Sequence, residues 1–232
     1  MNRRLEPLTQ QVRARLGKHL LLDTTHAQLF FEDEHHPWRA IPRDALRVPL
    51  TGPPVADPVD GHWWTIELGG TRRTHAVRAW DRPPPDCPEL TGVLVIHHDA
   101  ADQWLEEEQP VPGMPKNPYH RVDVLPASRH IEIRVHGELL ATTRRPTLVV
   151  ETGLPPRWYI PPGDIHWDRL TPNPRRTVCQ YKGTAHYWTI DHTHPPLLVW
   201  SYPEPLPETA ALAGLVSILD DDPGVDLREL AG

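Results

Sequence analysis

The chain has 232 residues, a formal net charge of −7 and a pI near 6.1. It carries no block of Lys or Arg, and an acidic chain without one lacks the positive surface that binds a phosphate backbone, so we expect no nucleic-acid partner. No apolar run reaches the length of a signal-peptide core or a membrane span, so we expect a cytoplasmic protein with no membrane partner.

The composition predicts a mainly β protein, all-β to α+β, with few short helices. Nine tryptophans supply large side chains for a core. Twenty-nine prolines argue against long helices, because an interior proline removes an amide donor and clashes with the preceding turn. Cys87 and Cys179 are the only cysteines, too few for a disulfide framework or a four-ligand zinc site, so we expect two reduced thiols.

An internal repeat organises the chain. Residues 12–42 align with residues 133–161, and further on HWWTI at residues 62–66 aligns with HYWTI at residues 186–190. Matched positions occur in the same order in both copies, and the pairs are Glu32 with Glu151, Pro37 with Pro156, Ile41 with Ile160, Trp80 with Trp200 and Gly92 with Gly214. The repeat predicts two tandem domains of one architecture.

Each copy is expected to fold as a series of antiparallel strands. Residues 10–22 and 130–142 alternate apolar and polar positions around a turn, which is typical of a β-hairpin. An apolar strand (QLFFE or TLVVE), a proline-rich crossing, the HxWTI strand, a Trp-containing strand and a last apolar strand follow in both copies. Helix signals are confined to AADQWLEEE at residues 100–108, PETAALAG at residues 207–214 and DLREL at residues 226–230.

We expect mostly antiparallel β-domains at residues 1–109 and 131–232, joined by a proline-rich connector at residues 110–130. The connector carries charged and aromatic side chains, which favours an ordered segment at the domain junction over a flexible linker. Clefts between domains are frequent ligand sites, and ion pairs that fix the domain angle are the alternative. The junction candidates are Tyr119, His120, Arg121, Asp123 and Arg129.

Four segments carry a family resemblance, and they are ETGLPPRWYIPPGDI, TVCQYKGTAHYWTI, VWSYPEPLPE and NPYHRVDVLPASRHIEIRV. On these segments the chain resembles the two-domain bacterial members of the family called domain of unknown function 427 (DUF427). The resemblance implies an antiparallel fold similar to the β-tent of cereblon's ligand-binding domain. It also brings a nucleotidyltransferase label, which no motif in the sequence supports independently. Gln180 departs from the family's Cys-Pro-Tyr-Lys-Gly, and Met114 to Lys116 from its His-Pro-Arg.

The family pattern and the local chemistry both indicate a site in the second domain. The first copy has ADPVDG where the second has Cys179, Tyr181 and Lys182. Carboxylate, ammonium, phenol and indole groups together can line a pocket for a small polar or anionic molecule. The expected ligand-binding residues are Glu151, Tyr159, Cys179, Lys182, Trp200 and Tyr202. As an alternative, Lys182 and Glu151 form only an internal ion pair.

Three functions remain open: a small-molecule binding module, which we favour, an enzyme, and a structural or protein-interaction domain. The enzyme hypothesis has Cys179 and Lys182 as catalytic candidates, because a nearby cation can lower the pKa of a thiol. Against it, a lone cysteine is commonly a buried small hydrophobe. The family label also leaves a transferase open.

The remaining motifs predict neither a metal nor a cofactor. His192 and His194 offer two ligands without a third at suitable spacing. In the HYWTI strand, His186 and Trp188 share one face and Tyr187 the other, and we expect Trp188 in the core. No phosphate-binding glycine motif is present, so we expect no cofactor. The expected partner is an unknown small molecule, and assembly into a homo-oligomer stays open.

Overall fold

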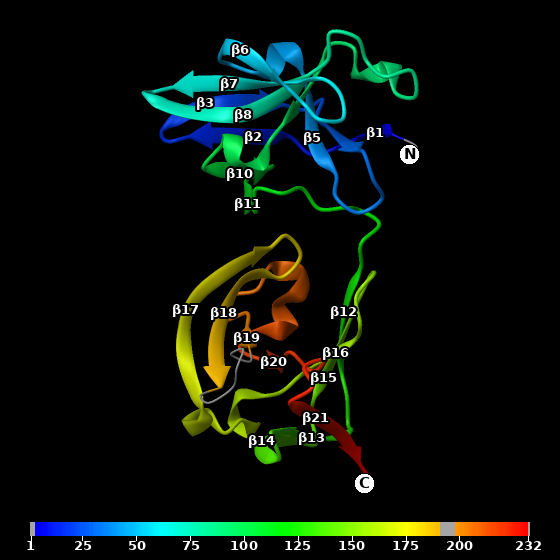
Figure 1. Ribbon diagram of the computed structural model, residues 1–232, viewed down its shortest axis with the longest axis vertical. Helices are drawn as coiled ribbons and strands as arrows, with labels where there is room; N and C mark the ends of the chain where they lie inside the picture. The colour runs from blue at the N-terminus through cyan, green and yellow to red at the C-terminus, as the bar shows by residue number, and fades with distance from the viewer. Residues whose placement is uncertain (1–2, 191–197, 232) are drawn as a thin grey trace. The chain divides into compact units, whose positions relative to one another are not determined.

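The computed structural model describes residues 3–190 and 198–231. The chain forms two compact units, Met1–Asn117 and Pro118–Gly232, which we call the first and second domains. Residues 110–117 thus belong to the first domain and residues 118–130 to the second. Strands dominate both units (Figure 1), which confirms the predicted mainly β class. None of the helices in the described residues has the length and hydropathy needed to cross a membrane.

The first domain contains a seven-stranded sheet in the order β1-β4-β5-β9-β8-β7-β6 and a four-stranded sheet in the order β11-β10-β2-β3. Its strands are β1 (Arg4–Pro7), β2 (Val12–Leu16), β3 (His19–Thr24), β4 (Gln28–Phe31), β5 (Trp38–Pro42), β6 (Leu50–Ala56), β7 (His62–Leu68), β8 (Thr71–Ala79), β9 (Val93–Ile96), β10 (Gln103–Glu106) and β11 (Gln109–Val111). The 3-10 helices are η1 (Arg43–Ala45), η2 (Pro88–Leu90) and η3 (His98–Ala100). Buried aliphatic residues from both sheets, among them Leu22, Ile41 and Ile66, form its main core.

The second domain contains three sheets in the orders β12-β15-β16, β14-β13-β21 and β17-β18-β19-β20. Its strands are β12 (Val122–Pro126), β13 (His130–Val135), β14 (Glu138–Thr143), β15 (Thr147–Glu151), β16 (Arg157–Tyr159), β17 (Leu170–Cys179), β18 (Gly183–Ile190), β19 (Leu198–Ser201), β20 (Val216–Ile218) and β21 (Val225–Leu230). The 3-10 helices are η4 (Pro162–Asp164), η5 (Trp167–Arg169) and η6 (Pro207–Leu212). Buried aliphatic residues, among them Ile131, Ile133 and Val199, form its main core, and Trp188 packs against this core, as predicted.

Both predicted hairpins are present. Strand β2 pairs with β3, and β13 pairs with β14, each with one register shift. The second hairpin turns at His136 and Gly137, whose φ angles are 49° and 83°. Two successive left-handed residues match the backbone twist of the flanking strands, which is why such turns close two-residue hairpins.

The predicted helices at residues 100–108 and 226–230 are wrong, and that at residues 207–214 is shorter than expected. Residues 100–108 contain β10, which pairs with both β2 and β11, and residues 226–230 lie in β21, which pairs with β13 along its whole length. Helix η6 ends at Leu212 and is interrupted at Thr209, whose φ is −120°. Short segments have weak helical preference, so strand pairing decides their structure.

Strand register confirms the internal repeat and corrects one pair of the alignment. Trp63 on β7 pairs with Arg78 on β8, whereas the matching Tyr187 on β18 pairs with Trp200 on β19. Trp200 is therefore equivalent to Arg78, and two residues later Tyr202 is equivalent to Trp80. The predicted match of Trp80 with Trp200 is wrong. In the adjoining hairpins, Phe30 pairs with Trp38 and Val149 with Arg157, which makes Glu32 equivalent to Glu151, as predicted.

Candidate functional site

A cavity of about 280 Å³ lies in the second domain. Its walls come from β15, β16 and the turn between them, from β18 and the turn that precedes it, from β19 with Tyr202 after it, and from Leu219 after β20. Five of the six expected ligand-binding residues line the cavity, and they are Glu151, Tyr159, Lys182, Trp200 and Tyr202. The structure thus brings together side chains from four separate stretches of the chain.

Cys179 is the sixth expected ligand-binding residue, and it does not belong to the described residues that line the cavity. It is half-buried and packs against a hydrophobic cluster that includes Tyr159, Tyr202 and Leu212. As the last residue of β17, it pairs with Gly183 across the hairpin. The Cys179 side chain therefore packs in the cluster that holds Tyr159 and Tyr202, outside the cavity lining.

Two polar lining residues were missed by the sequence reasoning. Arg157 lies two positions before Tyr159 on β16, so the two-residue period of a strand places both on one face. Tyr187 lies on the face of β18 opposite that of Trp188, and its cross-strand partner is Trp200. Strand periodicity applied to Tyr159 would have found Arg157, whereas Tyr187 follows only from the pairing of β18 with β19.

A tight turn brings Lys182 into the domain interior. Gly183 follows it with a φ of 99°, and a Cβ at Gly183 would approach the carbonyl oxygen of Glu204 to 3.2 Å. The amide of Leu206 donates to the Lys182 carbonyl oxygen at 3.2 Å. This end of the β17–β18 hairpin lies beside η6 (Figure 1), and the Thr209 hydroxyl donates to the carbonyl oxygen of Tyr181 at 3.2 Å. The ammonium group is thereby fixed at the wall of the cavity.

The Glu151 carboxylate joins Lys182 to His120. Lys182 Nζ donates to Oε2 of Glu151, and Nε2 of His120 lies 3.0 Å from Oε1. The side chains of Lys182 and Glu151 are only 10% and 9% exposed. The His120 ring stacks on Tyr181, with centroids 4.0 Å apart and an interplanar angle of 14°. The ion pair that the sequence offered as an alternative to ligand binding is present, and both carboxylate oxygens have partners.

His120 is the junction candidate that the structure places at this site. Tyr119 is exposed, Arg121 pairs with Asp123 at 3.0 Å on the surface, and Arg129 pairs with Glu229 at 3.2 Å. These four side chains lie in the second domain without lining the cavity described above. Of the connector candidates, His120 thus contacts a lining residue of the cavity, through Glu151.

The phenols in the cavity are hydrogen-bond donors at any physiological pH. Burial raises the pKa of Tyr159 far above its ordinary value and outweighs the lowering effect of the Trp200 indole, whose Nε1 donates to the Tyr159 hydroxyl at 3.1 Å. Burial also raises the pKa of Tyr202, and nearby ionisable groups add to the effect. Both groups remain protonated because ionising a phenol away from water is unfavourable.

Arg157 closes one side of the cavity. Its guanidinium pairs with Asp220 through Nη1 and reaches Asp221 at 3.4 Å through Nη2. It also lies over the Trp200 ring, 5.6 Å from the centroid. Arg157 is thus held by two acidic residues at the cavity edge.

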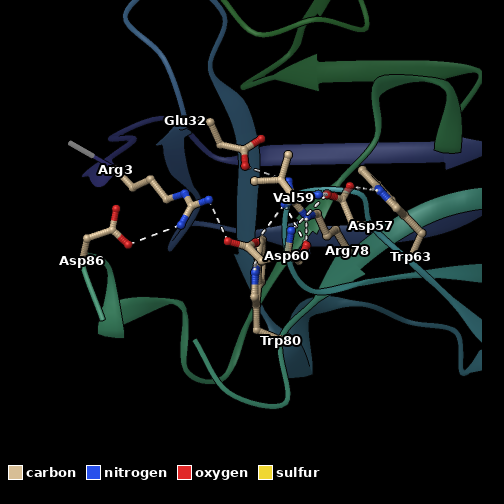
Figure 2. A network of polar contacts seen from close by, with 9 residues as sticks. All are labelled: Arg3, Glu32, Asp57, Val59, Asp60, Trp63, Arg78, Trp80 and Asp86. Atoms are coloured by element: carbon tan, nitrogen blue, oxygen red, sulfur yellow. Dashed lines mark hydrogen bonds and ion pairs between the residues drawn. The ribbon is translucent and has the colours of Figure 1, made fainter. Parts of the chain in front are cut away.

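The equivalent region of the first domain has a different polar arrangement, shown in Figure 2. Arg78, at the position of Trp200, is 2% exposed. Its guanidinium contacts the carboxylates of Glu32 at 2.9 Å, Asp57 at 3.2 Å and Asp60 at 2.9 Å. Trp80 Nε1 donates to Asp60 at 2.5 Å. The first domain therefore supplies its own cation at this position.

The wider network in Figure 2 favours the ionised form of the Asp57 carboxylate. Burial raises the pKa of Asp57, but donors at Val59 and Trp63 together with the charge of Arg78 outweigh it, so the net effect is a lowered pKa. The Trp63 indole donates to Asp57 at 2.6 Å, and Arg3 pairs with Asp60 at 2.7 Å. Hydrogen bonds to the charged form stabilise that form.

Histidines in the first domain form a second chemical cluster. One ligand atom from each of His97, His98 and Asp99 lies within 4.8 Å of the others. The two rings stack 4.2 Å apart, and Nδ1 of His97 accepts a hydrogen bond from the Asp99 amide at 3.1 Å. That lone pair is in use, so these residues would have to rearrange to hold a metal. His192 and His194, considered above as ligands, lie outside the described residues.

The fold and the site define a tandem, mainly β protein with a cavity lined by polar and aromatic groups in its second domain. The model of the family described as a domain of unknown function (DUF427) matches residues 4–107 and again residues 123–228. The chain belongs to this family as a two-domain member, as the sequence predicted. A search of curated proteins found no match. Because the family description names no activity, the function has to be argued from the site.

Proposed function

We propose that the second domain binds a small polar or anionic molecule in the cavity next to Lys182. The observation that carries this proposal is the convergence of Tyr202, Lys182 and Arg157 on one cavity whose other walls, apart from the Glu151 carboxylate, are aromatic and aliphatic. The volume of about 280 Å³ is just below the range of roughly 300–1,000 Å³ that is common for ligand pockets. Apolar walls with a few convergent polar groups are typical of such pockets.

The Tyr202 hydroxyl is central to the proposal. Tyr202 is 6% exposed, and its ring packs in the cluster with Tyr159 and Leu212. A protonated phenol at a cavity wall has a hydrogen-bond donor to offer to a ligand. A ligand with an acceptor group satisfies it.

The covalent alternative receives less support from the geometry. Cys179 does not line the cavity, and the Lys182 ammonium is paired with Glu151. A nucleophilic lysine or thiol has to reach the reacting atom, and an amine must lose its proton first. Non-covalent binding needs neither change.

Native mass spectrometry of protein purified without added ligand tests the proposal, and a thermal-shift screen of a small-molecule library extends it. We expect a co-purified molecule, or library compounds that raise the melting temperature. Leu198 lines the cavity, so Leu198→Trp should block it and abolish the shift. Leu125→Trp is the matched control, because Leu125 is exposed on β12. Compounds that stabilise the Leu198→Trp variant equally, or a screen without any stabilising compound, would overturn the proposal.

A further inference from the structure

We infer that the ligand of this cavity is an uncharged molecule that presents a carbonyl oxygen on a flat ring. This inference rests on the proposed function and narrows the ligand class from polar or anionic to one chemistry. It depends on three observations: the pairing of the charged wall residues within the chain, two phenols with a hydrogen left to donate, and the aromatic and aliphatic walls.

The charged side chains at the cavity wall are neutralised by partners from the chain itself. Lys182 pairs with Glu151. Arg157 pairs with Asp220 and reaches Asp221 at 3.4 Å. A charged ligand would either enter without a counter-charge or separate one of these pairs, and an uncompensated charge away from water is unfavourable. An uncharged ligand leaves all of these pairs intact.

Two phenols at the cavity have a hydrogen left to donate. Both are protonated, because burial raises their pKa values. The Tyr159 oxygen accepts from Trp200 Nε1 at 3.1 Å, which leaves its own hydrogen for another acceptor. The Tyr202 hydroxyl has no hydrogen-bond partner among the described residues, whereas that of Tyr187 is bonded to Thr177 at 2.8 Å. A carbonyl oxygen has two lone pairs and can accept from both free donors.

The first domain satisfies the equivalent ring donor from within the chain. Trp80, which is equivalent to Tyr202, donates through Nε1 to Asp60 at 2.5 Å (Figure 2). Asp60 lies in the turn between β6 and β7. The equivalent turn of the second domain, between β17 and β18, presents the Lys182 ammonium to the cavity, and an ammonium group accepts no hydrogen bond. Tyr202 thus lacks the acceptor that the first domain provides, and a ligand in the cavity supplies it.

The walls and the volume of the cavity suit a flat ring that carries the carbonyl. Trp200, Tyr187 and Leu198 provide flat and aliphatic surfaces, and aromatic side chains pack against planar rings in offset-stacked or edge-to-face arrangements. An apolar cavity of about 150 Å³ holds a benzene ring, so about 280 Å³ accommodates a ring with a carbonyl group. Aromatic ketones, amides and lactams share this chemistry.

Four probes with the same ring test the acceptor and the charge separately on the full chain. Acetophenone carries the carbonyl, α-methylstyrene has a methylene group in place of the oxygen, and benzoate and benzamidine carry an anionic and a cationic head. We expect acetophenone to bind about tenfold more tightly than α-methylstyrene, which cannot accept the two hydrogen bonds. Benzoate and benzamidine should each bind at least about tenfold more weakly than acetophenone, because they bring an unpaired charge. Titration followed by NMR measures the four dissociation constants.

The Tyr202→Phe variant removes one hydroxyl and keeps the ring. It should weaken acetophenone binding about fivefold and leave α-methylstyrene binding unchanged, because only the ketone accepts from the phenol. Tyr119→Phe is the matched control and should change neither, because Tyr119 is exposed and away from the cavity lining. Leu198→Trp should abolish the binding of both probes, since Leu198 lines the cavity. Melting curves establish that the three variants fold.

The outcomes separate this inference from the proposed function. Equal affinity for acetophenone and α-methylstyrene would overturn the carbonyl, and tighter binding of benzoate or benzamidine would overturn the neutral charge; both results would leave the cavity as a ligand site. The same loss in Tyr202→Phe and Tyr119→Phe, or acetophenone binding that survives in Leu198→Trp, would also overturn the inference. If none of the four probes binds, the inference is wrong. The proposed function fails as well only if the library screen finds no ligand for the cavity.

Discussion

Replacing Arg78 with methionine removes a buried cation from the centre of three carboxylates in the first domain. The Arg78 side chain is 3% exposed, and those of Glu32, Asp57 and Asp60 are between 10% and 23% exposed. Breaking a buried ion pair on one side costs about 3–5 kcal/mol, because the remaining charge is left without its partner. The carboxylates here retain some contact with water and Arg3 stays beside Asp60, so we expect the lower end, about 3 kcal/mol.

The chain offers a matched control on the same strand. Arg73 on β8 pairs with Asp102 at 2.6 Å, and the two side chains are 35% and 48% exposed. Exposed pairs contribute about 0.2–1 kcal/mol because solvent screens them. Arg73→Met should therefore cost less than about 1 kcal/mol.

Urea denaturation of the full chain followed by tryptophan fluorescence measures both losses, and hydrogen exchange with mass spectrometry assigns them to a domain. The exchange rates of core amides on β7 and β9 should rise in Arg78→Met and stay the same in Arg73→Met. Equal losses below about 1 kcal/mol in both variants would contradict the reasoning. A loss located in the second domain would contradict it too.

Three further predictions concern single groups. Lys182→Met should destabilise the second domain by about 3 kcal/mol, and adding Glu151→Gln should restore most of it, since replacing both partners of a buried pair is nearly neutral; a double-mutant cycle in urea measures the coupling. The pKa of Asp57 is lowered, so the stability that it contributes is present above its unfolded pKa and is lost as the pH falls through its folded pKa. Asp57→Asn should thus flatten the acid limb of melting temperature against pH below about pH 4. Burial, followed by the charge of nearby Glu89, raises the pKa of the Cys87 thiol, so iodoacetamide should label Cys87 only after unfolding. Fast labelling of Cys179 at neutral pH would instead support the covalent alternative.

The sequence predicted those elements whose signal is local. Hairpins and the HxWTI strands follow from alternation over a few residues, and the repeat reports each of them twice. The helix prediction at residues 226–230 failed because β21 is determined by its partner β13, which lies far away in the chain. Local preference is weak for so short a segment, and the long-range pairing was not visible in the sequence.

The sequence predicted most of the residues that form the site but few of the contacts between them. Glu151 and Lys182 were named from the sequence, and their mutual pairing was one of two alternatives. His120 was assigned to the domain junction, yet it lies beside Glu151, 31 residues away in the chain. Strand β12 pairs with β15 and brings the start of the second domain to Glu151, where Val122 lies opposite it. Such a position follows from strand order, which the spacing of residues alone does not give.

The two domains build one arrangement from different parts of the chain. A carboxylate, a cation and a ring meet in each: Glu32 with Arg78 and Trp80, and Glu151 with Lys182 and Tyr202. In the first domain the cation is Arg78 on strand β8, and its guanidinium contacts the Glu32 carboxylate.

In the second domain the cation comes from the turn between β17 and β18, which leaves the strand position on β19 free for a residue of the cavity wall. Lys182 reaches Glu151 from the end of the β17–β18 hairpin. The equivalent strand position on β19 no longer has to satisfy the carboxylate, and it carries Trp200, which forms a cavity wall. Lys182 therefore contributes to the site in two ways, by neutralising Glu151 and by releasing a strand position for an aromatic wall. This division of roles explains why the turn that distinguishes the second copy from the first lies next to the cavity.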